Sequence, residues 1–92
     1  MEFEWDPDKA AQNLRKHGVS FAEVSTVFGD SLAGTAADPE HSLRESRYIT
    51  VGTSNRGRLL IIAHADRGER VRIISARKLT RTEREAYEET QS

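Results

Sequence analysis

Residues 47–77 read RYITVGTSNRGRLLIIAHADRGERVRIISAR, three strand-like runs separated by two turn sequences. The runs are rich in β-branched residues, which favour strands, and the turn sequences are short enough for hairpins. The runs span Arg47 to Thr53, Leu59 to Ala65 and Val71 to Arg77. The stretch therefore predicts three antiparallel strands, with the middle run in the centre of the sheet because it begins with apolar residues on both faces.

The N-terminal residues predict a short strand followed by a helix. Phe3 and Trp5 alternate with acidic residues, as in a strand with one buried face. The pair Asp6-Pro7 is typical of a helix start, since Asp caps the first amides and Pro fits the first helical position. Gly18 is expected to end this helix in a left-handed conformation.

Two further helices are predicted from capping boxes. Ser20 and Glu23 have the S-x-x-E spacing that satisfies unpaired amides at a helix start, and so do Thr80 and Glu83. Between them, residues 31–37 are small and weakly β-like, and we expect an edge strand there. The predicted order is β-α-α-β-β-β-β-α in a single domain, residues 1–92. The fold class is α+β, a small antiparallel sheet with two N-terminal helices packed on it and a C-terminal helix.

Composition excludes several classes of protein. The chain has no cysteine, which excludes disulfides, thiolate zinc sites and a cysteine nucleophile. Its start, MEFEWDPDK, is acidic and does not resemble a secretory signal. The longest apolar run, Leu59 to Ala63, is too short to cross a bilayer. We therefore expect a cytoplasmic protein without a membrane partner.

Charge is distributed unevenly along the chain. The total is −1, but residues 44–84 carry ten arginines and Lys78 against four acidic residues, a net charge of +7. Residues 1–43 carry three basic and eight acidic residues, a net charge of −5. The basic middle is typical of a protein that binds a polyanion such as nucleic acid. Arginines that only decorate exposed strand faces are the alternative interpretation.

Hairpin register predicts a cluster of polar side chains. If the loops are Ser54 to Gly57 and Asp66 to Arg70, then Arg47, His64 and Arg72 lie side by side across three strands. Glu45 would extend that row, and a slip of one residue in either hairpin would destroy it.

Such a row suits RNA cleavage without a metal. The 2′-hydroxyl must lose a proton, the leaving 5′-oxygen must gain one, and the phosphoryl charge must be stabilised. His64 and Glu45 are the candidate proton-transfer groups, and Arg47 and Arg72 the candidate phosphate ligands. The competing interpretations are a salt-bridged surface, a non-catalytic basic module that docks an acidic protein segment or DNA, and a purely structural partner.

The other polar residues carry weaker signals. Arg77 and Ser75 point away from the predicted row in a regular strand. Because Arg77 is near the strand end, a bulge or the turn into the last helix could re-aim it, and Arg77 is a further candidate phosphate ligand. His17 is interpreted as a helix-end residue, and His41 lies in a loop. We expect no cofactor and no metal, because the three histidines lack ligand spacing and no glycine-rich phosphate loop is present.

The chain resembles the BrnT-type toxins over residues 3 to 89. The matching stretches are FEWDPDKAAQNLRKHGVSFAEVSTVFGD, ESRYITVG and HADRGERVRIISARKLTRTEREAYEE, of which KHGVSF and RIISAR are the most distinctive. The resemblance implies a RelE-like ribonuclease fold and RNA cleavage that blocks translation. Polar positions that match the family pattern are Lys16, His17, Glu45, Arg47, His64, Arg67, Arg72, Ser75 and Arg77. Of these, Arg67, Arg77 and Lys16 are candidates for holding RNA.

The resemblance also implies a partner. A BrnA-type antitoxin with a ribbon-helix-helix DNA-binding part would neutralise the toxin. The complex would repress its own operon, so that operator DNA is contacted only through the antitoxin.

Overall fold

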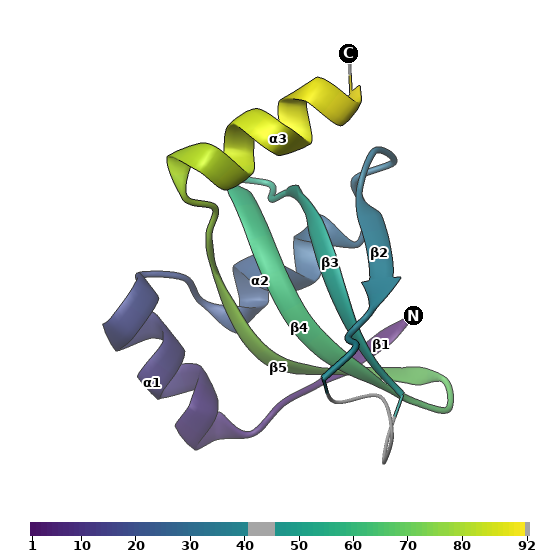
Figure 1. The fold of residues 1–92 in the computed structure, drawn as a ribbon. Helices are drawn as coiled ribbons and strands as arrows, with labels where there is room; N and C mark the ends of the chain where they lie inside the picture. Colours follow the sequence, from purple (N-terminus) through teal and green to yellow (C-terminus); the bar gives the residue numbers. More distant parts are fainter. Residues whose placement is uncertain (41–45, 92) are drawn as a thin grey trace.

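Two helices cover one face of a five-stranded sheet in the computed structural model of the chain, which describes residues 1–40 and 46–91 (Figure 1). A third helix crosses one end of the sheet. The elements are β1 (Glu2–Glu4), α1 (Pro7–His17), α2 (Phe21–Val27), β2 (Gly34–Ala37), β3 (Arg47–Thr53), β4 (Leu59–Arg67), β5 (Arg70–Lys78) and α3 (Arg81–Gln91). The predicted fold class and the predicted order of elements are confirmed. No helix in the described ranges is long and apolar enough to span a bilayer.

The sheet has the strand order β1-β5-β4-β3-β2. Strands β2 to β5 pair antiparallel with their neighbours, and β2 forms an edge as predicted. At the other edge β1 pairs with β5 in parallel, with Phe3 opposite Val71. The expected antiparallel meander therefore holds for four strands and not for β1. Two helices separate β1 from the rest of the sheet, so no hairpin turn sets its direction.

Local capping explains where the helices begin and end. The Asp6 carboxylate accepts from the Asp8 amide at 2.8 Å, and Gly18 ends α1 with a φ of 68°. Ser20 caps the start of α2, and its hydroxyl accepts from the Glu23 amide at 3.1 Å. The second half of that predicted capping box is missing, because the Glu23 carboxylate instead binds side chains of the β3–β4 turn.

The hydrophobic core lies between the sheet and helices α1 and α2. On β4 the even-numbered residues Leu60 and Ile62 point into it, and their neighbours Ile61 and Ala63 point to the other face. Eight buried side chains form the core: Val19, Phe21, Val24, Val27, Leu60, Ile62, Ile73 and Ala76. The sheet thus has a covered face and an open face.

The predicted β3–β4 register is wrong by one residue. Val51 lies opposite Ile61 rather than Leu60, and Arg47 lies opposite Ala65 rather than His64. The turn contains five residues instead of four, because the Ser54 amide donates to the Arg58 carbonyl at 2.9 Å. A shift of one residue exchanges the faces of a strand, so the predicted row cannot form.

The β4–β5 pairing also differs from the prediction. Ala65 rather than His64 lies opposite Arg72, and the turn is shorter than expected because Arg67 pairs with Arg70. The register shifts between Ala63, which faces Ser75, and His64, which faces Ile73. Ile74 is therefore the extra residue of a β-bulge. This bulge places Arg72 on the same face as Ser75 and Arg77, which a regular strand would not do.

Candidate functional site

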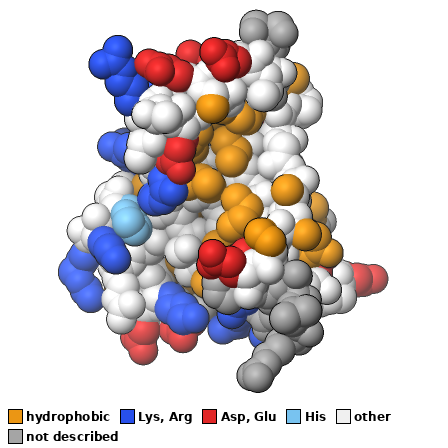
Figure 2. Space-filling view, in the orientation of Figure 1, with side chains coloured by type: hydrophobic (Ala, Val, Ile, Leu, Met, Phe, Trp, Pro, Cys, Tyr) orange, Lys and Arg blue, Asp and Glu red, His pale blue; other side chains and the backbone are white. Residues whose placement is uncertain are grey.

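The open face of the sheet gathers apolar and basic side chains (Figure 2). Hydrophobic side chains occupy its centre, and Lys and Arg side chains lie along the side where α1 is placed. Strand register assigns Ile49, Ile61, Ala63, Ser75 and Arg77 to this face. Among the described residues, no helix packs over these side chains as α1 and α2 do on the covered face.

A hollow of about 320 Å³ lies on this face. It brings together His17 at the end of α1 with Ser75 and Arg77 of β5, above a floor that includes Ile61 and Ala63. An imidazole, a hydroxyl and a guanidinium group thus share one small depression. These groups can move a proton and bind an anion.

Buried Asn13 fixes the end of α1 beside β5. Its side-chain amide donates to the Val19 carbonyl at 3.0 Å and accepts from the Ala76 amide at 3.0 Å. One polar side chain therefore ties α1, the turn after it and the middle of β5 together. This tie holds His17 next to the strand that carries Ser75 and Arg77.

Arg77 is held by the first turn of α3. Its Nη1 and Nη2 atoms donate to the two carboxylate oxygens of Glu83 at 2.7 and 3.0 Å. This hydrogen-bonded pairing raises the pKa of Arg77 and, together with the Thr80 amide, lowers that of Glu83 to about 2. Both groups are therefore charged at neutral pH.

Arg47 and Arg72 lie further along the open face, on either side of Ala65. The prediction placed them on either side of His64, so the two arginines stay neighbours although the residue between them is different. Arg72 donates to the Glu4 carboxylate of β1 at 2.9 Å. Both arginine residues are half-buried.

His64 lies on the covered face, and the predicted row of Arg47, His64 and Arg72 is wrong. His64 is 4% exposed, and its Nε2 is 2.7 Å from the Thr50 hydroxyl. Its ring contacts the Phe28 ring edge-on and stacks on the Tyr48 ring. Burial lowers the pKa of His64 below the usual 6.5, against a smaller opposite effect of Asp66. His64 shares the covered face with Leu60 and Ile62, and the change in register places Arg47 opposite Ala65, on the other face.

The remaining candidates lie apart from the hollow. Arg67 is exposed at the far end of β4, about 20 Å along the strand from the position paired with Arg77. Lys16 is exposed near the end of α1. Glu45 and His41 lie outside the described residues. Within the described ranges, no group of three or more His, Cys, Asp or Glu side chains could hold a metal ion.

Two residues of the site have a role beyond the one that the sequence predicts. The sequence predicts His17 as a helix-end residue, and His17 does end α1, but it also lines the hollow. Glu83 was assigned only to a capping box. The signal for its second role is its short separation in sequence from Arg77, which lies one residue before the end of β5.

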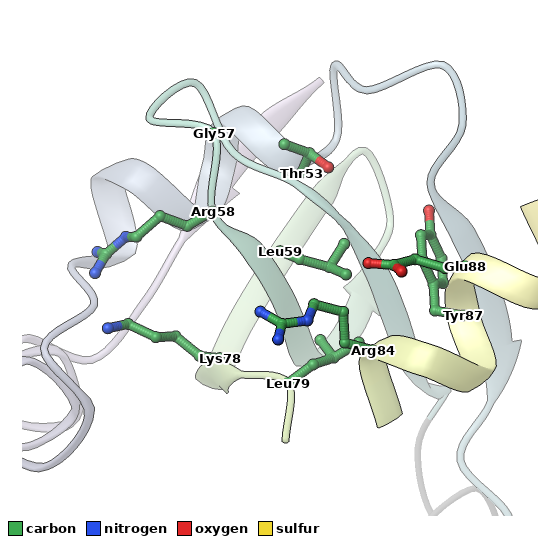
Figure 3. A pocket seen from close by; sticks show the side chains of 9 residues that line it. All are labelled: Thr53, Gly57, Arg58, Leu59, Lys78, Leu79, Arg84, Tyr87 and Glu88. Carbon is green, nitrogen blue, oxygen red and sulfur yellow. The ribbon is translucent and has the colours of Figure 1, made fainter. Parts of the chain in front are cut away.

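A second hollow, of about 700 Å³, lies between α3 and the end of the sheet (Figure 3). Leu59 and Tyr87 contribute apolar walls, and Lys78 and Arg84 contribute positive charge. Leu59 precedes Ile61 by two residues on the same face of β4. The open face therefore continues to α3, where Glu88 adds a negative charge to the lining of the hollow.

Comparisons with known proteins agree with this architecture. The family model described as "Ribonuclease toxin, BrnT, of type II toxin-antitoxin system" matches residues 5–83. The crystal structure of the Brucella abortus ribonuclease toxin BrnT superposes with a TM-score of 0.70 at 23% identity, covering 88% of this chain and 99% of that chain. Among curated proteins, none matches the chain. The structural likeness shows a shared fold. Since the family model spans most of its length, the chain belongs to the BrnT family of ribonuclease toxins of type II toxin–antitoxin systems.

Proposed function

We propose that this toxin cleaves RNA internally, without a metal ion, on the open face of its sheet, and so blocks translation. The observation that carries the proposal is the hollow shared by His17, Ser75 and Arg77. It supplies the charge stabilisation and proton transfer that attack by a 2′-hydroxyl requires.

Each side chain has a distinct proposed task. Arg77 binds the phosphate under attack, because a guanidinium group matches the spacing of two phosphoryl oxygens. His17 exchanges a proton with the 2′-hydroxyl or with the leaving oxygen, and Ser75 donates a hydrogen bond to the phosphate. The RelE-like chemistry implied by the family resemblance is consistent with these roles.

The rest of the open face holds the RNA on either side of the hollow. Arg47 and Arg72 are proposed to bind a neighbouring phosphate, and Lys16 and Arg67 to attract the chain at longer range. A role for Glu45 as the base stays a prediction. His64 is not proposed as a contact, since the covered face encloses it.

The proposed inhibitor is a BrnA-type antitoxin with a ribbon-helix-helix part that binds operator DNA. We propose that its toxin-binding segment is acidic and covers the open face, since the net charge of residues 44–84 is +7. Alanine at Arg47 or Arg72 would then weaken the complex as well as RNA cleavage. Unchanged antitoxin affinity would show that inhibition occurs elsewhere.

The test is RNA cleavage by the purified chain in EDTA, with the two histidines as a matched pair. We expect cleavage to survive chelation, to be lost in His17→Gln and to persist in His64→Gln at a pH where both variants are folded by circular dichroism. Cleavage that needs an added divalent cation would contradict metal independence. Equal activity of the two variants would contradict the placement of the site.

A further inference from the structure

Arg77 has unused hydrogen-bonding capacity on one edge of its guanidinium group. The group has five N–H donors in a planar arrangement. Nη1 donates to Glu83 and to the Lys78 carbonyl, at 2.7 and 3.2 Å, and Nη2 donates once to Glu83 at 3.0 Å. In the described part of the chain, no acceptor is bonded to Nε or to the second Nη2 hydrogen. These two hydrogens lie on the same edge, as a two-pronged contact with phosphate requires.

Glu83 is itself fixed by the start of α3. One carboxylate oxygen accepts from the Thr80 amide at 2.8 Å, and the Thr80 hydroxyl accepts from the Glu83 amide at 3.2 Å. The capping box therefore orients the carboxylate that binds Arg77. Only five residues separate Arg77 from Glu83, so the strand end, the cap and the ion pair form one local unit.

We propose that Glu83 is a positioning residue, which clamps Arg77 so that the unused edge of the guanidinium group can bind an RNA phosphate in the hollow. The inference rests on the proposed function and adds to it a residue outside the hollow. An arginine side chain has many rotamers, and the clamp removes that freedom before RNA arrives. Glu83 remains ionised at any pH near neutrality, since its pKa is lowered to about 2.

The decisive variant is Glu83→Gln. Glutamine is accepted at this position of a capping box, so the helix start is retained. Its amide has one oxygen instead of two and presents N–H donors to the guanidinium group, which breaks the two-pronged pairing. The matched control is Glu85→Gln, which removes the same charge from the same helix but affects only the exposed pair with Arg81.

We expect Glu83→Gln to lower kcat/KM for RNA cleavage by about 10- to 100-fold, since a small misplacement of a reacting group has effects of this size. Glu85→Gln is expected to keep wild-type activity, and both variants to melt within a few degrees of the wild type. Equal activity of the two variants, with the wild type active, would overturn the inference and leave the proposed function intact. Faster cleavage by Glu83→Gln would also overturn it, because Glu83 would then compete with RNA for Arg77.

A binding measurement separates this inference from the proposed function. The probe is a fully 2′-O-methylated RNA oligonucleotide, which cannot undergo 2′-hydroxyl attack, and the readout is the ¹⁵N resonance of Arg77 Nε. The resonance should shift on titration in the wild type and in Glu85→Gln, and not in Glu83→Gln. This pattern would support the clamp even if the wild type failed to cleave RNA. No shift in the wild type would overturn it.

Discussion

The two faces of the sheet place histidine side chains in different environments. On the covered face, His64 is enclosed by aromatic rings and bonds to Thr50, whose hydroxyl lies 2.7 Å from that of Thr35. On the open face, His17 lines a hollow with Ser75 and Arg77. Burial, rather than residue type, therefore decides which histidine is available for chemistry.

The Arg58–Glu23 and Arg77–Glu83 ion pairs show the same contrast in burial. Glu23 and Glu83 each occupy the third position of a helix, each is bound by the fork of an arginine, and each has a pKa lowered to about 2. The Glu23 side chain is 4% exposed, whereas that of Glu83 is 36% exposed. Because the two ion pairs differ in burial, we expect the Arg58–Glu23 pair to contribute mainly to stability and the Arg77–Glu83 pair mainly to activity.

The largest effect is expected for Arg77→Ala. Loss of a preorganised donor to a developing oxyanion lowers turnover by about 10²- to 10³-fold. The melting temperature should change by only a few degrees, since exposed ion pairs contribute little to stability. Cleavage kinetics measure the loss of turnover, and thermal melting measures the change in stability. Arg81→Ala is the control, because it also removes an arginine that is paired with a glutamate of α3. Retained turnover in Arg77→Ala would mean that the reaction does not use this hollow.

A smaller effect, on stability, is expected for Glu23→Gln. Arg58 would lose its carboxylate partner and keep the Gly18 carbonyl, and Ser54 would keep one acceptor. Breaking this mostly buried ion pair should lower the free energy of unfolding by about 2 kcal/mol. Denaturant unfolding measures the change, and RNA cleavage below the transition should be unaffected. If Glu23→Gln instead lowered cleavage without changing stability, the contrast between the two pairs would be wrong.

The next effect concerns pH and His64. The folded state lowers the pKa of His64, so the unfolded state binds more protons below pH 6.5 and stability falls as the pH decreases. This group should lower stability between pH 7.5 and 5.5 by no more than about 1.4 kcal/mol. Glu23 adds nothing in this range, because its contribution is lost only below pH 4.5.

The control for this effect is His64→Gln, which has no group that titrates in the range. Melting temperatures of both proteins at pH 7.5 and 5.5 give the comparison. The decrease should be larger for the wild type. Equal slopes would show that other groups dominate the acid response.

The elements of the fold could be predicted because their signals are local. Asp6-Pro7, Gly18 and the Thr80–Glu83 capping box mark helix ends through contacts within a few residues. Strand runs carry their own β-branched pattern. The direction of β1 has no such signal, because its neighbour β5 is distant in sequence.

The site was harder to predict because register depends on distant contacts. The β3–β4 turn takes its length from Ser54 and Arg58, both of which bind Glu23 of α2. The bulge at Ile74 has no marker of its own in the sequence. The change in register and the shorter β4–β5 turn together put Arg47 and Arg72 on the face opposite to His64, and the two arginines stayed adjacent because both now flank Ala65.

The smallest effect is expected for Tyr87→Phe at the border of the open face. The Tyr87 hydroxyl donates to the Leu32 carbonyl at 3.1 Å and ties α3 to the segment before β2. Losing one such bond should weaken the docking of α3 by about 0.5 kcal/mol, so amides of α3 should exchange about twofold faster.

Hydrogen exchange followed residue by residue tests whether this effect is confined to α3. Tyr48→Phe is the control, since the Tyr48 hydroxyl has no partner within the described ranges. Amides in β4 and β5 should keep their wild-type rates in both variants, because the covered face and its core hold these strands independently of α3. If β4 and β5 exchanged faster together with α3, the helix would be part of the cooperative core. A clamp between Glu83 and Arg77 would then also be a stability element, and the separation between the two faces would be lost.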